Sequence, residues 1–296
     1  MESENIIKDT KGCEMKYNIE TDGFYGIKFC PIENKYPNKV IITFTGSDGS
    51  FKLACKMAQY FSGIGITSLA VAYWKVKGLP NAFVKVPLES IENAIRHLKK
   101  EGFEKIGVCG VSKGGELALL SGSMFNEING VIAISPIHVS AMGFKGMKEI
   151  EASSWSYKGE EIPYATGHMN ICKVIKESIL KGEPTMNFIY EDLISKCIPD
   201  SVIKVENING PILLISPEYD SMWTSKLSCE KVIERLKNNN FKNSYQHLNY
   251  EYAYHIVFPI TGFWDFFFKV ERKHKKLCKE TKTNLDINIK KWIQDW

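Results

Sequence analysis

The segment 104–124 (EKIGVCGVSKGGELALLSGSM) places the strongest limit on how this chain can fold. A short β-branched run ends in GVSKG (110–114), and a stretch with helical character follows directly. The pentapeptide G-x-S-x-G between a strand and a helix is typical of a nucleophile elbow, a sharp turn that exposes the serine Oγ. The glycines two positions before and after the serine permit that turn. We therefore predict that Ser112 is a nucleophile at the end of a strand.

Strand-like and helix-like segments alternate along most of the chain. Apolar strands that alternate with helices are typical of a mostly parallel sheet covered on both faces, so the predicted class is α/β. We treat residues 1–296 as one domain, with 1–37 as an N-terminal extension that contains short strands. Predicted strands cover 39–45, 66–73, 105–109, 130–135, 211–216 and 244–250, and predicted helices cover 51–61, 86–100, 113–124, 224–237 and 284–293.

The alternation breaks between residues 137 and 209. A stretch of this length is too long for a plain loop. It contains aromatic residues and one helix-like piece near 170–181. We interpret 137–209 as a lid insertion over the site, and the alternative is a set of extra helices packed beside the sheet.

Composition excludes several classes of protein. A net charge of +4 over 296 residues gives no reason to expect a nucleic-acid partner. No apolar run reaches the ~18–20 residues that a membrane helix needs, and the N-terminus has no apolar signal region. The eight cysteines are far apart and form no CxxC pair, so we expect reduced thiols in a cytoplasmic protein, with no disulfides and no zinc site. The sequence gives no oligomeric state.

A serine hydroxyl needs a base, which is usually a histidine oriented by a carboxylate. In strand–elbow–helix proteins the chain order is serine, then acid, then histidine. Of the six histidines, only His255 lies in a loop just after the last predicted strand, at a carboxyl end. The others fall in a helix, in the insertion, within a strand or in a lysine-rich stretch. We therefore predict that His255 is the base.

The acid is expected in the turn after the predicted strand 211–216. Asp220 and Glu218 both lie there, and both precede His255 in the chain. We favour Asp220 and keep Glu218 as the alternative.

An oxyanion hole needs two N–H donors. The first is expected from Lys113, the residue after the nucleophile, and the second from the loop that follows the first buried strand. That loop reads TGSDGS (45–50), and its glycines let the backbone turn an N–H group toward the site. We favour Ser47 as the second donor, with Asp48 as the alternative.

These segments resemble the C-terminal catalytic domain of the acyl-CoA thioesterase and bile acid-CoA:amino acid N-acyltransferase family, an α/β-hydrolase group related to dienelactone hydrolase. The resemblance covers roughly residues 20–296. It implies an α/β-hydrolase fold with Ser112 as nucleophile, Asp220 as orienting acid and His255 as base. The segments that carry it are FTGSDGS (44–50), LAVAYW (69–74), IGVCGVSKGGELALL (106–120), IKVENINGPILLIS (203–216), EYDSMW (218–223) and EYAYHIVFP (251–259).

The resemblance implies hydrolysis of an acyl thioester, such as an acyl-CoA, to free acid and thiol through an acyl-enzyme. Family members that transfer the acyl group to an amino acid use cysteine at the elbow, so Ser112 favours the hydrolytic branch. The alternatives are a carboxylic-ester or dienelactone-type hydrolase and an acyl-CoA-dependent acyltransferase. We expect a small-molecule substrate, no cofactor and no metal. The aromatic run FFF (266–268) is either core or part of an acyl pocket, and core packing is favoured.

Overall fold

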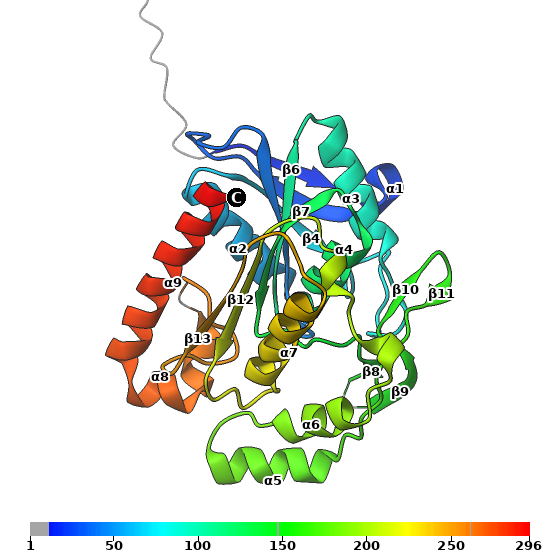
Figure 1. Ribbon diagram of the computed structural model, residues 1–296, viewed down its shortest axis with the longest axis vertical. Coiled ribbons are helices and arrows are strands. Elements are labelled where there is room, and N and C mark those ends of the chain that lie inside the picture. Colours follow the sequence, from blue (N-terminus) through cyan, green and yellow to red (C-terminus); the bar gives the residue numbers. More distant parts are fainter. Residues whose placement is uncertain (1–11, 147, 261) are drawn as a thin grey trace, which may run out of the picture.

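The computed structural model describes residues 12–146, 148–260 and 262–296. An eight-stranded sheet crosses the middle of the molecule, with strand order β1-β2-β4-β3-β6-β7-β12-β13 (Figure 1). The bounds of these strands are β1 Glu14–Tyr17, β2 Tyr25–Phe29, β3 Lys39–Phe44, β4 Thr67–Ala72, β6 Lys105–Val111, β7 Ile128–Ile134, β12 Ile212–Pro217 and β13 Tyr245–Tyr250.

The six strands from β4 to β13 run parallel, and β1 and β2 join them in antiparallel pairs at one side. The prediction of an α/β fold with a mostly parallel sheet is confirmed. Because the carboxyl ends of parallel strands meet at one edge of the sheet, the loops after β3, β6, β12 and β13 come together there. These four loops carry the residues that the sequence singled out.

Helices cover both faces of the sheet (Figure 1). Alternate residues of β3 point to opposite faces, as the two-residue period of a strand requires. Val40 and Ile42 belong to the core cluster that includes residues of α3, α4 and α7, whereas Ile41 belongs to the cluster that includes residues of α2 and α9. The bounds of the longer helices are α2 Phe51–Gly63, α3 Glu89–Lys100, α4 Lys113–Met124, α7 Ser225–Asn238 and α9 Lys275–Asp295, and the short helices are α1 Ile19–Asp22 and α8 Lys269–Lys273.

The apolar spacing in the sequence accounts for most of these elements. In α3, Ile91, Ile95 and Leu98 lie on one face and are buried. The last helix begins at Lys275, earlier than the predicted 284. The prediction missed its first turns because they are rich in lysine and carry few apolar residues that would indicate a buried face. Within the described ranges, no helix has the length and apolar content needed to cross a membrane.

The segment 137–209 contains small strands and two helices. The strands form a two-stranded sheet and, with β5 (Val86–Pro87), a three-stranded sheet. Figure 1 shows α5 and α6 at the end of the molecule where α8 also lies. A role for the segment as a lid stays a prediction. Its elements are β8 Met142–Lys145, β9 Lys148–Ser153, β10 Trp155–Tyr157, β11 Glu160–Glu161, α5 Ile171–Lys181, α6 Asn187–Ser195, and the 3₁₀ turns η1 Pro199–Ser201 and η2 Val205–Asn207.

The expectation that all cysteines are reduced is wrong for one pair. Cys13 and Cys30 form a disulfide, with Cα atoms 5.0 Å apart. They flank the antiparallel pair β1–β2, whose register sets Glu14 opposite Phe29. Strand register therefore brings the two thiols together, and their spacing of 17 residues in the sequence gave no sign of it. The other six cysteines are free.

Candidate active site

Ser112 lies at the turn between β6 and α4. Its backbone has φ 60° and ψ −123°, a conformation that residues with a side chain seldom adopt. Holding a non-glycine residue in such a region costs about 1–3 kcal/mol, so the surrounding structure has to impose it. The Ser112 N–H donates to the Ile134 carbonyl on β7 at 2.9 Å, and the Ser112 carbonyl accepts from Gly115 at 2.8 Å. These contacts hold the serine on a sharp strand-to-helix turn, as the pentapeptide predicted.

Gly110 shows why the turn needs small residues. A Cβ atom at this position would lie 1.9 Å from the carbonyl oxygen of Gly114, on the far side of the turn. No side chain fits in that space, so alanine at Gly110 would force the elbow open. The glycine pattern in the sequence therefore reflects a direct backbone-to-backbone approach beneath the serine.

His255 and Asp220 form a buried pair at the same edge of the sheet. The His255 Nδ1 atom lies 2.8 Å from Asp220 Oδ2 and 3.0 Å from Oδ1. The two side chains are only 6% and 2% exposed. Their loops follow β13 and β12, which are neighbouring parallel strands. A carboxylate in this position fixes the orientation of the imidazole ring and leaves Nε2 as the atom that can take up a proton.

Further donors surround the Asp220 carboxylate. Its Oδ1 accepts from the N–H groups of Met222 and Trp223 at 2.9 and 3.3 Å, and its Oδ2 accepts from Ser225 Oγ at 2.6 Å. These hydrogen bonds satisfy the buried acid, which would otherwise be costly to remove from water.

Glu218, the alternative acid, points to a different environment. Its carboxylate forms an ion pair with Lys226 at 2.5 Å and also accepts from Asn249. Those two hydrogen bonds lower the pKa of Glu218. The pair is partly exposed, and among the contacts of the described residues Glu218 has none with His255. The geometry therefore favours Asp220.

Ser112 and His255 line one pocket of about 130 Å³, together with Ser47. Within the described ranges, the Ser112 hydroxyl forms no hydrogen bond, so it is available to a ligand. Catalytic hydrogen bonds are often absent or long in an empty site and form when a substrate binds. The other five histidines do not line this pocket; His138, for example, is buried beside Ser228, and burial lowers its pKa to about 4.

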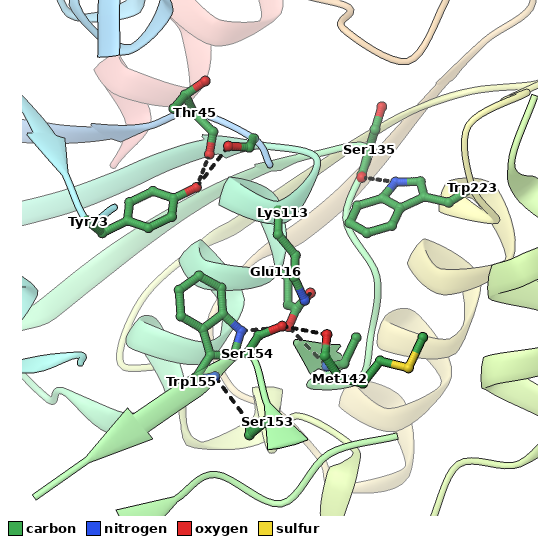
Figure 2. Close-up of polar contacts among 12 residues, drawn as sticks. Thr45, Tyr73, Lys113, Glu116, Ser135, Met142, Ser153, Ser154, Trp155 and Trp223 are labelled. Atoms are coloured by element: carbon green, nitrogen blue, oxygen red, sulfur yellow. Dashed lines mark hydrogen bonds and ion pairs between the residues drawn. The ribbon is translucent and has the colours of Figure 1, made fainter. Parts of the chain in front are cut away.

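Ser135, the residue after β7, links the acid and base loops. Its carbonyl accepts from Trp223 Nε1 at 2.6 Å (Figure 2), and its hydroxyl donates to the His255 carbonyl at 2.7 Å. The Trp223 ring also lies edge-on to the His255 ring, with centroids 5.5 Å apart. One residue therefore fixes both loops relative to the sheet. Neither Ser135 nor this use of Trp223 was predicted from the sequence.

The loop after β3 approaches the nucleophile closely. A Cβ at Gly46 would lie 3.2 Å from Ser112 Cβ. The buried Tyr73 hydroxyl donates to the carbonyls of Thr45 and Gly46 at 2.5 and 3.2 Å (Figure 2). In a planar trans peptide the N–H points away from the C=O, so the N–H of Ser47 is directed away from Tyr73. Tyr73 therefore sets the direction of the N–H group that the sequence indicated as a donor.

Lys113 follows the nucleophile, and its side chain turns inward to a buried ion pair (Figure 2). Its Nζ lies 2.6 Å from Glu116 Oε2, and the two side chains are 4% and 0% exposed. Burial lowers the pKa of the Lys113 ammonium, and the Glu116 carboxylate opposes that shift. Glu116 Oε1 also accepts from Trp155 Nε1 at 2.6 Å and from the Ala141 N–H at 3.1 Å. The carboxylate thus connects the start of α4 to the segment 137–209.

We expect Glu116→Ala to lower the free energy of unfolding by about 3–5 kcal/mol, because it leaves the Lys113 ammonium buried without a partner. The matched control is Glu234→Ala. Glu234 also pairs with a lysine three residues away, Lys231, but both side chains are about half exposed. Removing an exposed pair costs about 0–1 kcal/mol. Urea unfolding of the two variants measures the difference. Equal losses would show that the buried pair contributes no more than a surface pair.

The described residues offer no site for a metal, since they contain no group of three or more His, Cys, Asp or Glu side chains placed to hold one. The candidate site brings together the Ser112 hydroxyl and the buried His255–Asp220 pair, and the two N–H donors stay a prediction. Such a set can carry out nucleophilic attack on an acyl carbonyl with proton transfer through histidine.

Comparison with known proteins places these features in context. Residues 86–263 match the family model described as "BAAT / Acyl-CoA thioester hydrolase C terminal". The peroxisomal succinyl-coenzyme A thioesterase of Mus musculus is 26% identical over 205 residues, which cover 68% of this chain and 45% of that protein. The mitochondrial acyl-coenzyme A thioesterase 2 of Mus musculus is 28% identical, with 68% of this chain and 42% of that protein covered. The chain thus spans less than half the length of these relatives.

Solved structures agree on the fold. An α/β-hydrolase enzyme, MGS-M1, from a Medee basin deep-sea metagenome library superimposes with a TM-score of 0.55 at 14% identity, covering 96% of this chain and 98% of that one. The Pyrococcus furiosus esterase Pf2001 gives 0.52 at 13% identity, with 96% and 98% covered. At such low identity the likeness extends to the arrangement of sheet and helices alone.

Proposed function

Because this chain belongs to the BAAT / acyl-CoA thioester hydrolase C-terminal family, we propose that it is a serine hydrolase that cleaves acyl thioesters, acyl-CoA among them, to a free acid and a thiol. The observation that carries the proposal is that His255, paired with the buried Asp220 carboxylate, lines the same pocket as Ser112, whose backbone is strained.

In the first half-reaction, the Ser112 Oγ attacks the thioester carbonyl carbon while His255 Nε2 accepts the hydroxyl proton. Asp220 stabilises the imidazolium that forms. The negative charge that develops on the carbonyl oxygen is stabilised by the N–H groups of Lys113 and Ser47. The carbon–sulfur bond then breaks, His255 returns the proton to the thiolate, and the acyl group remains on Ser112.

In the second half-reaction, a water molecule attacks the acyl-enzyme. His255 accepts a proton from the water and then donates it to Ser112 Oγ as the acid leaves. The same oxyanion donors act in both halves. Tyr73 supports this role of Ser47, because the tyrosine hydroxyl holds the carbonyls of the same loop.

The relatives are named as acyl-CoA thioesterases, and this chain spans less than half of their length. Acyl-CoA hydrolysis by this chain is therefore part of the proposal. Small-molecule thioesters are the substrates that the family membership supports. A cytoplasmic location stays a prediction, because relatives named as peroxisomal and mitochondrial share the same domain.

A panel of acyl-CoAs beside oxygen esters with the same acyl groups tests the function. We expect release of free CoA thiol, measured with a thiol reagent, at turnover numbers of about 1–10³ s⁻¹. Hydrolysis of the oxygen esters alone would contradict the thioester proposal and favour a carboxylic-ester or dienelactone-type hydrolase. Addition of amino acids as acceptors in the same assay distinguishes acyl transfer from hydrolysis.

A further inference from the structure

The pocket at Ser112 is small. Its volume is about 130 Å³, whereas sites for larger ligands occupy roughly 300–1,000 Å³. An apolar cavity of about 150 Å³ holds one benzene molecule, a group of six carbon atoms. Most of the other residues that line the pocket are apolar, among them Leu53, Pro184, Met222, Ile256, Trp264 and Phe268.

The described residues that line the pocket include no lysine or arginine that could pair with a carboxylate on the acyl group. Lys75 lies outside this lining, and its Nζ donates to the backbone carbonyl of Asp48 at 3.1 Å. The one acidic residue that lines it is Asp48, on the loop after β3, which accepts from the Thr45 hydroxyl at 3.1 Å. A carboxylate at the far end of an acyl group would lose its hydration here without gaining a cation. The chemistry of the pocket therefore disfavours dicarboxylic acyl groups.

The outer wall of the pocket is fixed by a buried stack and a network of ion pairs. The Phe268 ring stacks on Tyr254 with centroids 4.4 Å apart. The Tyr254 hydroxyl donates to Asp265 at 2.5 Å, and Lys282 from α9 pairs with Asp265 at 2.8 Å and with Glu271 at 2.6 Å. These contacts hold the segment that carries Trp264 and Phe268 against the body of the protein.

Arg272 joins this wall to the segment 137–209. Its guanidinium donates to the carbonyls of Phe266 and Phe267 at 3.0 and 2.8 Å, and to the Gly182 carbonyl at 2.6 Å. Gly182 caps the C-terminal end of α5, and Pro184 two residues later lines the pocket. One side chain thus ties both sides of the pocket mouth, the helix end on the insertion and the aromatic segment before α8.

From this geometry we infer that the acyl group of the substrate is short and uncharged, about six carbons or fewer, and that Arg272 sets this limit by holding the pocket walls together. The inference rests on the proposed thioester hydrolysis and names the class of acyl group that the same site accepts. Longer chains extend beyond the pocket and gain no further contact within it. Succinyl and related groups place a carboxylate beside Asp48.

The test uses butanoyl-, hexanoyl-, hexadecanoyl- and succinyl-CoA with the full chain, and kcat/KM is measured for each. We expect butanoyl- and hexanoyl-CoA to react best, with hexadecanoyl-CoA lower by about 10-fold or more, a factor that small differences in pocket fit commonly produce. Butanoyl and succinyl groups have the same number of carbons and differ in the terminal carboxylate. We expect succinyl-CoA to be lower by at least about 10-fold, because its carboxylate is desolvated without a partner.

Two variants test the walls. Leu53→Ala enlarges the pocket, and Leu227→Ala on α7, an exposed leucine, is its matched control. Arg272→Met removes the hydrogen bonds to the three carbonyls, and Arg96→Met, an exposed arginine of α3, is its control. We expect both wall variants to raise the hexadecanoyl-to-butanoyl ratio of kcat/KM about 3- to 10-fold, and both controls to leave it unchanged. Circular dichroism confirms that each variant is folded.

The outcomes separate this inference from the proposed function. Failure to hydrolyse any acyl-CoA would overturn the function itself. Hydrolysis with hexadecanoyl-CoA as the best substrate, or with succinyl-CoA equal to butanoyl-CoA, would overturn the acyl-group assignment and leave the function in place. A short-chain preference that Arg272→Met does not alter, in a folded variant, would overturn the role of Arg272.

Discussion

Ser112→Ala is expected to lower kcat for every substrate by about 10⁴- to 10⁶-fold, because the proposed acyl-enzyme forms on the Ser112 hydroxyl. KM should change little, since the hydroxyl contributes to the chemical step more than to binding. The strained backbone conformation at the elbow costs alanine about as much as serine, so the free energy of unfolding should stay close to that of the wild type. Thiol release under saturating acyl-CoA measures the loss.

Ser123→Ala is the matched control for this variant. Ser123 lies on α4, and its hydroxyl donates to the Leu120 carbonyl within the helix. We expect it to retain full activity and to react with a fluorophosphonate probe, which labels activated serines. The Ser112 variant should not be labelled. Labelling of the Ser112→Ala protein, or turnover that survives the change, would show that the nucleophile lies elsewhere.

Asp220→Asn has the second largest expected effect, a loss of about 10⁴-fold in kcat. An amide at this position cannot stabilise the imidazolium, and it favours the wrong tautomer of His255. The size of the effect follows from geometry, because the carboxylate is buried and lies 2.8 Å from His255 Nδ1. Glu218→Gln, the same change at the alternative acid, should alter kcat by less than about 3-fold, because that side chain pairs with Lys226 at the surface and such pairs contribute little.

The comparison of these two variants decides which carboxylate is the orienting acid. A large loss in Glu218→Gln with a small one in Asp220→Asn would reverse the assignment. Equal, moderate losses would indicate that both act through the stability of the turn after β12, and the melting temperature of each variant would then fall with its activity.

The sheet and the loops that carry the candidate site residues could be predicted from the sequence, because both follow from local patterns of apolar residues and from chain order. The continuous apolar strands from β3 to β12 and the amphipathic α3 mark a parallel sheet covered by helices. Once Ser112 is placed after a strand, the carboxyl-end rule and chain order leave few partners. The structure brings His255 into the same pocket and sets Asp220 against it.

Other features depend on tertiary contacts that leave no local pattern. Lys113 and Glu116 are three residues apart, the spacing of an ordinary exposed ion pair on a helix. They are buried here, where Trp155 and Ala141 contact Glu116. The sequence favours core packing for the run 266–268, yet Phe266 is exposed, whereas Phe268 is buried and lines the pocket. Hydrophobicity cannot separate neighbouring residues whose burial is decided by what packs on them.

The three donors that meet at Glu116 have a consequence for how this protein can be shortened or recombined. The segment 137–209 supplies two of the three hydrogen-bond donors to the Glu116 carboxylate, on the helix that follows the nucleophile. Deleting this segment would remove the Ala141 and Trp155 donors. The Glu116 carboxylate would then keep only Lys113 as a partner, next to the strained turn at Ser112. A graft of the segment 137–209 without the helix after Ser112, or of that helix without the segment, would therefore have to replace the hydrogen bonds that Glu116 makes to both.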